Sequence, residues 1–303
     1  MQYDVAIVGG GPAGLSAALA LGRARQRVLL FDSGPRRNAA AVHLHNFVTR
    51  DGTQPTEFRR IGREQLAPYA NVTVRDALVD DISGERDAFT VQAGDGAALA
   101  RRVLLCTGMI DDLPALEGYR EFWGTSIFQC PYCHGWEVQD QRFAFLTPSL
   151  EMLEFASFLR NWSARVVALT DARFAVPSDV LSRLESARVR VDPRPLARLV
   201  GEAGRLQRIE FESGPPEPLD VLFARPPQRQ VPLVTRLGLA LDPAGFVQVD
   251  PIQRETSQPG IYAGGDLTTP MQGAILAAAS AVHAATMLAH GLTAERVRRG
   301  ELS

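Results

Sequence analysis

Short continuous apolar runs alternate with amphipathic segments over much of the chain. Residues 5–8 form a β-branched apolar run, residues 13–24 have helical character, and residues 27–32 form a second apolar run. The order repeats further on, with apolar runs at 143–146 and 165–170 around a helical pattern at 150–162. Runs of this kind separated by helices are typical of parallel strands buried on both faces. The pattern predicts an α/β protein.

A glycine-rich loop joins the first predicted strand to the first predicted helix. Gly9, Gly11 and Gly14 have G-x-G-x-x-G spacing, and the next strand ends in Asp32. Gly9 permits a tight turn, Gly11 allows a pyrophosphate to approach the backbone, and Gly14 lets the helix pack on the strand. Asp32 is placed to accept hydrogen bonds from a ribose. The segment predicts a dinucleotide site.

Composition narrows the class of protein. A chain of 303 residues can hold two domains, and its net charge of −2 gives no reason to expect a nucleic-acid or membrane partner. No signal-peptide pattern precedes the first strand, and the Ala-rich apolar run at 274–289 is expected to be a packed helix too short to cross a bilayer. Three cysteines are too few for a secreted disulfide scaffold, so a cytoplasmic location is expected.

Two of the three cysteines, Cys130 and Cys133, form a CxxC motif followed directly by His134. A structural zinc needs four ligands, and no second CxxC or H-x₃-H pair exists, so no metal site is predicted. An inert pair is the second possibility, but core packing gives little reason to place two thiols beside an imidazole. A redox-active pair is favoured, because a thiolate attacks a disulfide and the second sulfur then resolves the mixed disulfide. Cys106, on a predicted buried strand, is interpreted as a core residue.

Several motifs, in order, resemble those of the low-molecular-weight thioredoxin-reductase-like flavoproteins of the pyridine-nucleotide–disulfide oxidoreductase superfamily. They are the N-terminal glycine loop, "HNF" at 45–47, "LLCTGM" at 104–109, "CPYCHG" at 130–135 and "GIYAGGDL" at 260–267 with a helix from about residue 272. The resemblance covers nearly the whole chain and implies bound FAD, an enzyme and a homodimer. The residues that it and the glycine loop nominate for FAD binding are Gly9, Gly11, Pro12, Ala13, Gly14, Asp32, Asn46, Thr107, Gly108, Gly265, Asp266, Gln272, Gly273 and Ala274.

The resemblance also implies the domain organisation and the roles at the cysteine pair. Two Rossmann-like three-layer domains are expected: a discontinuous FAD domain, residues 1–112 and 228–303, and an inserted domain, residues 113–227, that carries the CxxC. Cys133 matches the sulfur that faces the flavin, and Cys130 matches the thiol that meets the substrate. His134 stands where thioredoxin reductases commonly carry an acid/base Asp, and a histidine titrating near neutrality would shuttle the proton.

The expected NADPH loop departs from the family pattern. Thr147, Ser149 and Met152 occupy its G-x-G-x-x-A positions, Pro148 removes an N–H donor, and Glu151 adds negative charge near the helix start. The paired arginines for the 2′-phosphate are missing, although Arg173 is near. We therefore expect no NADPH bound in the usual way. Oxygen, a ferredoxin or second flavin, or a nicotinamide bound elsewhere remain as electron partners.

These observations predict a FAD enzyme that moves electrons between flavin and the Cys130–Cys133 disulfide. Its partner would be a small dithiol or disulfide, or a thioredoxin-like protein. A conventional NADPH-dependent thioredoxin reductase is the alternative enzyme, and a non-catalytic flavin-binding redox sensor is the alternative of another class. An intact histidine beside intact cysteines argues against the sensor, which needs no proton shuttle.

Overall fold

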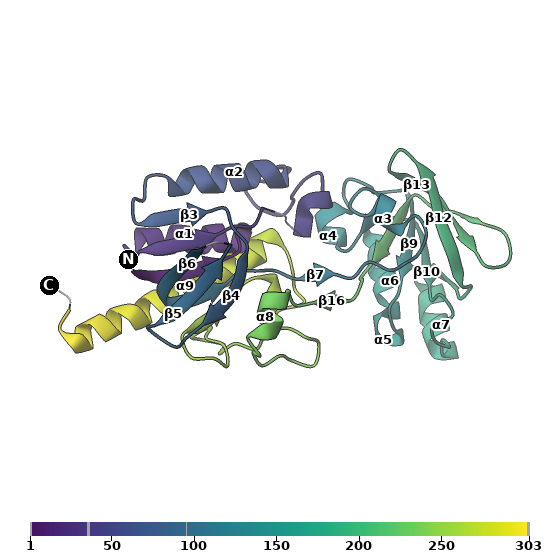
Figure 1. Cartoon of the computed structure of the whole chain (residues 1–303). Coiled ribbons are helices and arrows are strands. Elements are labelled where there is room, and N and C mark those ends of the chain that lie inside the picture. Colours follow the sequence, from purple (N-terminus) through teal and green to yellow (C-terminus); the bar gives the residue numbers. More distant parts are fainter. Residues whose placement is uncertain (1, 35–36, 95, 302–303) are drawn as a thin grey trace. The chain divides into compact units, whose positions relative to one another are not determined.

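The computed structural model, shown in Figure 1, describes residues 2–34, 37–94 and 96–301. Its contacts divide the chain into two compact units. Unit 1 contains residues 1–39, 47–110 and 228–303, and unit 2 contains residues 40–46 and 111–227. The segment 40–46 thus groups with unit 2, whereas the sequence-based boundaries place it in the FAD domain. The connecting strands β7 (Ile110–Asp111) and β16 (Gln228–Arg229) pair with each other.

A seven-stranded sheet forms the centre of unit 1, in the order β3-β2-β1-β6-β5-β4 with β17 also paired to β6. Its strands are β1 (Gln2–Val8), β2 (Val28–Phe31), β3 (Val72–Arg75), β4 (Val79–Ser83), β5 (Phe89–Ala93), β6 (Gly96–Leu105) and β17 (Ile261–Ala263). The strands β3, β2, β1, β6 and β17 are parallel, and β4 and β5 continue antiparallel. The carboxyl ends of the parallel strands therefore share one edge.

Side-chain alternation along β1 divides the core of unit 1 between the two faces of the sheet. Val5 and Ile7 pack on α1 and α9, while Ala6 and Val8 pack toward β4, β5 and α8. The helical segments are α1 (Pro12–Arg23), η1 (Arg37–Ala40), α2 (Pro55–Leu66), α8 (Pro232–Arg236), η3 (Asp266–Thr268) and α9 (Ala274–Arg299).

The predicted apolar helix at 274–289 is part of α9, which has 26 residues. By length and composition alone, α9 is long and apolar enough to cross a membrane. The expectation that it is too short to cross a bilayer was wrong, because the helix continues for ten residues beyond the apolar run. Buried side chains of α9 pack against α1 and the sheet, as in the core helix of a folded domain.

A five-stranded parallel sheet, in the order β11-β10-β9-β15-β8, lies at the centre of unit 2. An antiparallel sheet, β12-β13-β14, covers one of its faces, and helices cover the other. Its strands are β8 (Ile127–Phe128), β9 (Arg142–Leu146), β10 (Arg165–Leu169), β11 (Val189–Asp192), β12 (Leu196–Glu202), β13 (Arg205–Phe211), β14 (Glu217–Pro218) and β15 (Val221–Ala224). The predicted α/β class with two Rossmann-like units is confirmed, with a β layer on one face of unit 2.

The helix predicted over 150–162 is broken. It consists of α5 (Leu150–Leu153), α6 (Phe155–Phe158) and the 3₁₀ turn η2 (Leu159–Asn161). The apolar periodicity was right, since Leu153, Ala156 and Leu159 face the sheet, but backbone tightening at Glu154 interrupts the α-helical ladder. The other helices of unit 2 are α3 (Tyr119–Phe122), α4 (Pro131–His134) and α7 (Ser178–Ser186).

Candidate active site

The glycine loop of unit 1 connects β1 to α1 and leaves one position open. Gly9 has φ +114°, and a Cβ there would lie 2.3 Å from the carbonyl oxygen of Cys106. A Cβ on Gly14 would lie 1.8 Å from the carbonyl oxygen of Gly9. A Cβ on Gly11 would meet no described atom within 4 Å. The fold itself therefore requires glycine at 9 and 14, whereas the bare surface at Gly11, directly before Pro12, is available to a ligand.

Asp32 lies at the end of β2, is buried, and is held by two groups. Its Oδ1 accepts a hydrogen bond from the Gly34 N–H at 3.0 Å, and its Oδ2 accepts one from Arg59 Nε at 2.6 Å. Arg59, on α2, was not anticipated, because nothing local in the sequence links it to the end of β2. Each carboxylate oxygen has two lone pairs, so Asp32 keeps acceptor capacity for a ribose hydroxyl.

Thr107 and Gly108 follow β6 and lie beside the glycine loop. A Cβ on Gly9 would be 3.3 Å from the Thr107 backbone nitrogen, which shows how closely the two loops approach. Gly108 has φ +67° and no described atom within 4 Å of its ideal Cβ. Both loops thus leave the carboxyl edge of the parallel strands, where open α/β sheets bind dinucleotides.

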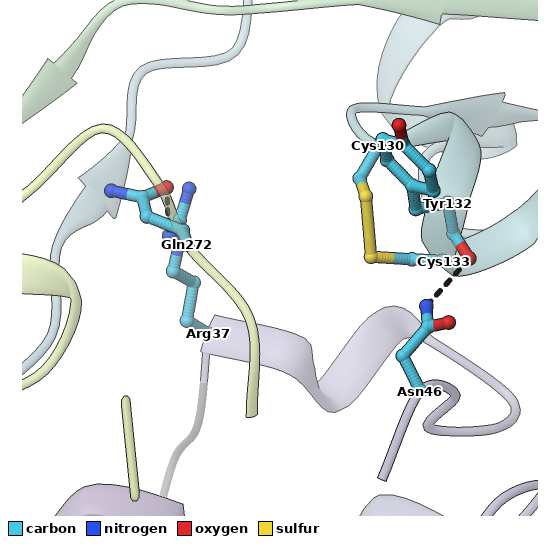
Figure 2. Close-up of a disulfide and its surroundings, with 6 residues drawn as sticks. All are labelled: Arg37, Asn46, Cys130, Tyr132, Cys133 and Gln272. Carbon is cyan, nitrogen blue, oxygen red and sulfur yellow. Dashed lines mark hydrogen bonds between the residues drawn. A yellow bond between two sulfur atoms is a disulfide. The ribbon is translucent and has the colours of Figure 1, made fainter. Parts of the chain in front are cut away.

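A polar cluster precedes α9 in the same unit. The Nη1 of Arg37 donates to Asp266 Oδ2 at 2.9 Å and to Gln272 Oε1 at 2.6 Å, and Figure 2 shows the latter contact. The side-chain amides of Gln272 and Gln228 also bond to each other, at 2.8 and 3.1 Å. Sequence reasoning identified Asp266 and Gln272 but missed Arg37 and Gln228, which no spacing rule singles out.

The residues of unit 1 fit a dinucleotide such as FAD. The N-cap residues of α1 and α9 are Gly11 and Gly273, which have no side chain to cap the first amides, and such helix starts suit anions. An ideal Cβ on Gly265 would lie 3.1 Å from Ala13 Cβ, so the turn before α9 adjoins the start of α1. Gly273, directly before Ala274, likewise has no described atom within 4 Å of its ideal Cβ.

The glycine loop gives a matched test of this fit. Gly11→Ala is expected to leave the unfolding temperature of the FAD-free protein within about 2 °C while weakening FAD retention about tenfold or more, because the added methyl occupies only ligand space. Gly14→Ala is expected to destabilise the FAD-free protein, because the methyl meets the Gly9 carbonyl. Flavin released on heating and thermal melting of the FAD-free forms measure both. Full FAD retention by a folded Gly11→Ala variant would contradict the assignment.

The cysteine pair in unit 2 follows β8. Cys130 and Cys133 form a disulfide with their Cα atoms 5.3 Å apart (Figure 2), and both are half-buried. Cys130 precedes α4, and Pro131 occupies the first helical position, where its missing N–H costs nothing. Gly135 is the C-cap of α4, and a Cβ there would lie 2.5 Å from the Pro131 carbonyl oxygen, so this position requires glycine. The turn thereby holds the two sulfurs within bonding reach.

His134 differs from the expectation. Its ring stacks on Phe128 at 4.4 Å, and both ring nitrogens are buried, with no hydrogen-bond partner in the described part of the chain. Burial lowers the pKa of His134 to about 4. The Glu137 carboxylate opposes this shift, as does a contact with the Cys130 backbone that falls short of hydrogen-bond geometry. The expectation of titration near neutrality was wrong for the disulfide form. In this state His134 is a neutral imidazole at neutral pH.

Asn46 belongs to unit 2 and adjoins the cysteine turn. Its Nδ2 donates to the carbonyl oxygen of Tyr132 at 2.6 Å (Figure 2), from a backbone with φ +63°. The structure therefore places this residue beside Cys130 and Cys133, in a different unit from the other nominated FAD residues. The contact spans 86 positions, which no local pattern reveals.

Side chains occupy the degenerate nucleotide loop between β9 and α5. The buried Thr147 hydroxyl donates to the carbonyl oxygen of Ser149 at 2.8 Å. The pKa of Glu151 is lowered, mainly by a hydrogen bond from the Ser149 hydroxyl and next by one from the backbone N–H of Glu151 itself. This carboxylate therefore engages the start of α5. Arg173 pairs with Asp171 at 3.0 Å. The helix start that would face a pyrophosphate is thus short and acidic.

A dinucleotide cradle in one Rossmann-like unit and a CxxC disulfide in a second define a nucleotide-dependent disulfide oxidoreductase. The chain belongs to the pyridine nucleotide-disulphide oxidoreductase family, which it matches over residues 3–285. A thioredoxin reductase of Leptosphaeria maculans is 30% identical to it, over 93% of this chain and 92% of that protein.

Solved structures agree with this membership. An oxidoreductase from Agrobacterium tumefaciens has a TM-score of 0.91 at 33% identity, covering 97% of this chain and 99% of its own. A putative thioredoxin reductase from Bacillus anthracis has a TM-score of 0.89 at 34% identity, over the same shares. The protein is therefore a thioredoxin-reductase-like, FAD-dependent disulfide oxidoreductase.

Proposed function

We propose that this enzyme moves electrons between FAD and the Cys130–Cys133 pair without binding NADPH at the usual loop. The observation that carries the proposal is the segment from Thr147 to Glu151. A pyrophosphate needs bare backbone and free amides at a helix start. Here a buried threonine side chain takes the first position, and a carboxylate engages the start of a four-residue helix.

The chain's residues divide the work of thiol–disulfide exchange. A substrate thiolate attacks Cys130 Sγ, Cys133 leaves as a thiolate, and a second substrate thiol then displaces Cys130 to give the product disulfide and the reduced pair. FAD, held by the unit 1 residues, supplies a two-electron redox group. His134, adjacent to Cys133 in the sequence and neutral in the disulfide form, would accept the proton that the attacking substrate thiol loses.

The partners we propose are a dithiol or disulfide, either a small molecule or a thioredoxin-like protein, and an electron partner such as oxygen or a ferredoxin. The thioredoxin reductase names of relatives support a disulfide partner. The low cysteine count supports a cytoplasmic location, and the family resemblance supports a homodimer.

Parallel anaerobic titrations of the bound flavin test the proposal. Dithiothreitol is expected to bleach the flavin absorbance through the cysteine pair. NADPH and NADH at about 100 μM are expected to leave the absorbance unchanged over minutes, because a loop that binds them more weakly than a millimolar Kd, about −4 kcal/mol, is mostly empty at that concentration. Fast bleaching by NADPH would instead establish a conventional NADPH-dependent thioredoxin reductase, the function that the names of the relatives favour. Failure of dithiothreitol to reduce the flavin would contradict both.

A further inference from the structure

An arginine from α2 fixes the carboxylate at the end of β2. Asp32 is 4% exposed, and Arg59 approaches one of its oxygens with two nitrogens, since Nε and Nη2 each lie 2.6 Å from Oδ2. The other oxygen, Oδ1, accepts a hydrogen bond from the Gly34 N–H at 3.0 Å. A carboxylate buried this deeply needs a partner for its charge, and within the described part of the chain that partner is Arg59.

The same carboxylate lies against the glycine loop. An ideal Cβ on Gly10 would be 2.1 Å from Asp32 Oδ2, so this oxygen is packed between the loop backbone and the guanidinium. Two nitrogens of Arg59 crowd Oδ2, whereas Oδ1 has one amide donor, so a further donor finds its acceptor on Oδ1. Gly11, the next residue of the loop, has no described atom within 4 Å of its ideal Cβ. The remaining acceptor of Asp32 thus adjoins backbone that is open to a ligand.

A second carboxylate and a second arginine stand beside this pair. Asp76 directly follows β3, and its Oδ1 lies 3.6 Å from Arg59 Nη2 and accepts a hydrogen bond from Arg63 Nη2 at 2.8 Å. Arg59 and Arg63 are one turn apart on α2, so they share a face of the helix. The Asp76 side chain is 66% exposed, so its pairing with Arg59 is weak and Asp32 is the main partner.

We propose that Arg59 is a positioning residue for FAD, which holds the Asp32 carboxylate so that Oδ1 accepts a hydroxyl of the adenosine ribose. Arg59 acts through Asp32 and does not itself bind the ribose. Without the guanidinium, a buried oxygen is left without a donor, the carboxylate rotates to satisfy it, and the ribose hydroxyl loses an oriented acceptor. The inference rests on FAD binding by unit 1 and is independent of the cysteine pair and of the electron partner.

A comparison of two ligands separates this hydrogen bond from general effects on the fold. The FAD-free full chain is titrated with FAD and with a synthetic FAD whose adenosine lacks the 2′-hydroxyl, which is the group that an acid at this position binds. Flavin fluorescence gives both Kd values. Wild type should bind FAD about tenfold more tightly than the analogue, as expected for one hydrogen bond to a charged group. Arg59→Met should weaken FAD binding about tenfold and leave the Kd of the analogue within about twofold, so that the preference disappears.

Arg63→Met is the matched control, because it removes a guanidinium from the same face of α2 that pairs with Asp76 and, in the part of the chain that the structure describes, not with Asp32. It should keep the wild-type preference. Equal weakening of both ligands in Arg59→Met would indicate a purely structural role and overturn the proposal. A retained preference in that variant, an absent preference in wild type or a lost preference in Arg63→Met would overturn it as well.

Two further measurements decide the question if a protein in this set fails. If Arg59→Met does not fold, Arg59→Lys keeps the charge but replaces the two-nitrogen contact by a single ammonium, so the preference should fall about threefold or more, and an unchanged preference would overturn the proposal. If the FAD-free chain does not rebind FAD, the rate of FAD loss from diluted holoenzyme replaces the titration. Arg59→Met should then lose FAD about tenfold faster than wild type, and equal rates would refute the assignment.

Discussion

Cys130→Ser is expected to abolish turnover with any dithiol, and Cys133→Ser to abolish it for a different reason. A serine hydroxyl at 130 cannot form the mixed disulfide, so the substrate has no sulfur to attack, while Cys133 remains able to perturb the flavin spectrum. A serine at 133 removes the resolving sulfur, so the flavin is disconnected while Cys130 stays open to alkylation. Steady-state assays, flavin spectra and alkylation mapping distinguish the two variants.

Cys106→Ala is the control for these substitutions. Cys106 is buried in the unit 1 core, where burial raises the pKa of its thiol, so it is expected to take no part in exchange. The variant should keep wild-type turnover at a temperature where it is folded. Wild-type turnover in either Cys130→Ser or Cys133→Ser would contradict the redox role of the cysteine pair. Loss of turnover in a folded Cys106→Ala protein would contradict the assignment of Cys106 to the core.

His134→Phe is expected to lower turnover and to raise stability in acid. Turnover should fall by about 10²–10⁴-fold, the usual contribution of a general acid or base. A phenyl ring keeps the stacking on Phe128 and removes two buried nitrogens that have no partner among the described residues. The same side chain would thus cost stability and serve the reaction.

The sign of the acid effect follows from the pKa of about 4 in the folded disulfide form. Between that value and the unfolded value of about 6.5, the unfolded chain binds a proton that the folded chain does not, so the free energy of unfolding falls as pH decreases through this window. The loss approaches about 3 kcal/mol at pH 4, because a tenfold difference in proton affinity between the two states corresponds to about 1.4 kcal/mol. Urea midpoints of the oxidised proteins at pH 7.5 and 4.5 measure it. If the gap between variant and wild type did not widen at pH 4.5, His134 would not be a buried neutral group.

Local sequence rules predicted the parts of the protein that are built from contiguous segments. The strand, glycine loop, helix and terminal Asp32 appear in one unbroken run, and the CxxC is one helical turn. The break in the helix at 150–162 was missed because apolar periodicity records which face is buried and not whether the backbone ladder is continuous.

The parts that could not be predicted depend on residues distant in sequence. The displaced pKa of His134 results from burial against Phe128, which a motif of adjacent residues does not encode. Arg59 reaches Asp32 from another element, and Arg37 reaches Asp266 across 229 positions. A sequence read without homologues has no signal for such pairs.

The grouping of residues 40–46 with unit 2 has a consequence for how the cysteine-bearing domain can be moved between relatives. A graft cut at 111 and 227 would carry Cys130, Cys133 and Glu137 but leave His45 and Asn46 in the recipient. The transplanted turn would then depend on whatever loop the host supplies. A graft that keeps the contact between Asn46 and the Tyr132 carbonyl therefore has to exchange two stretches together, residues 40–46 as well as 111–227.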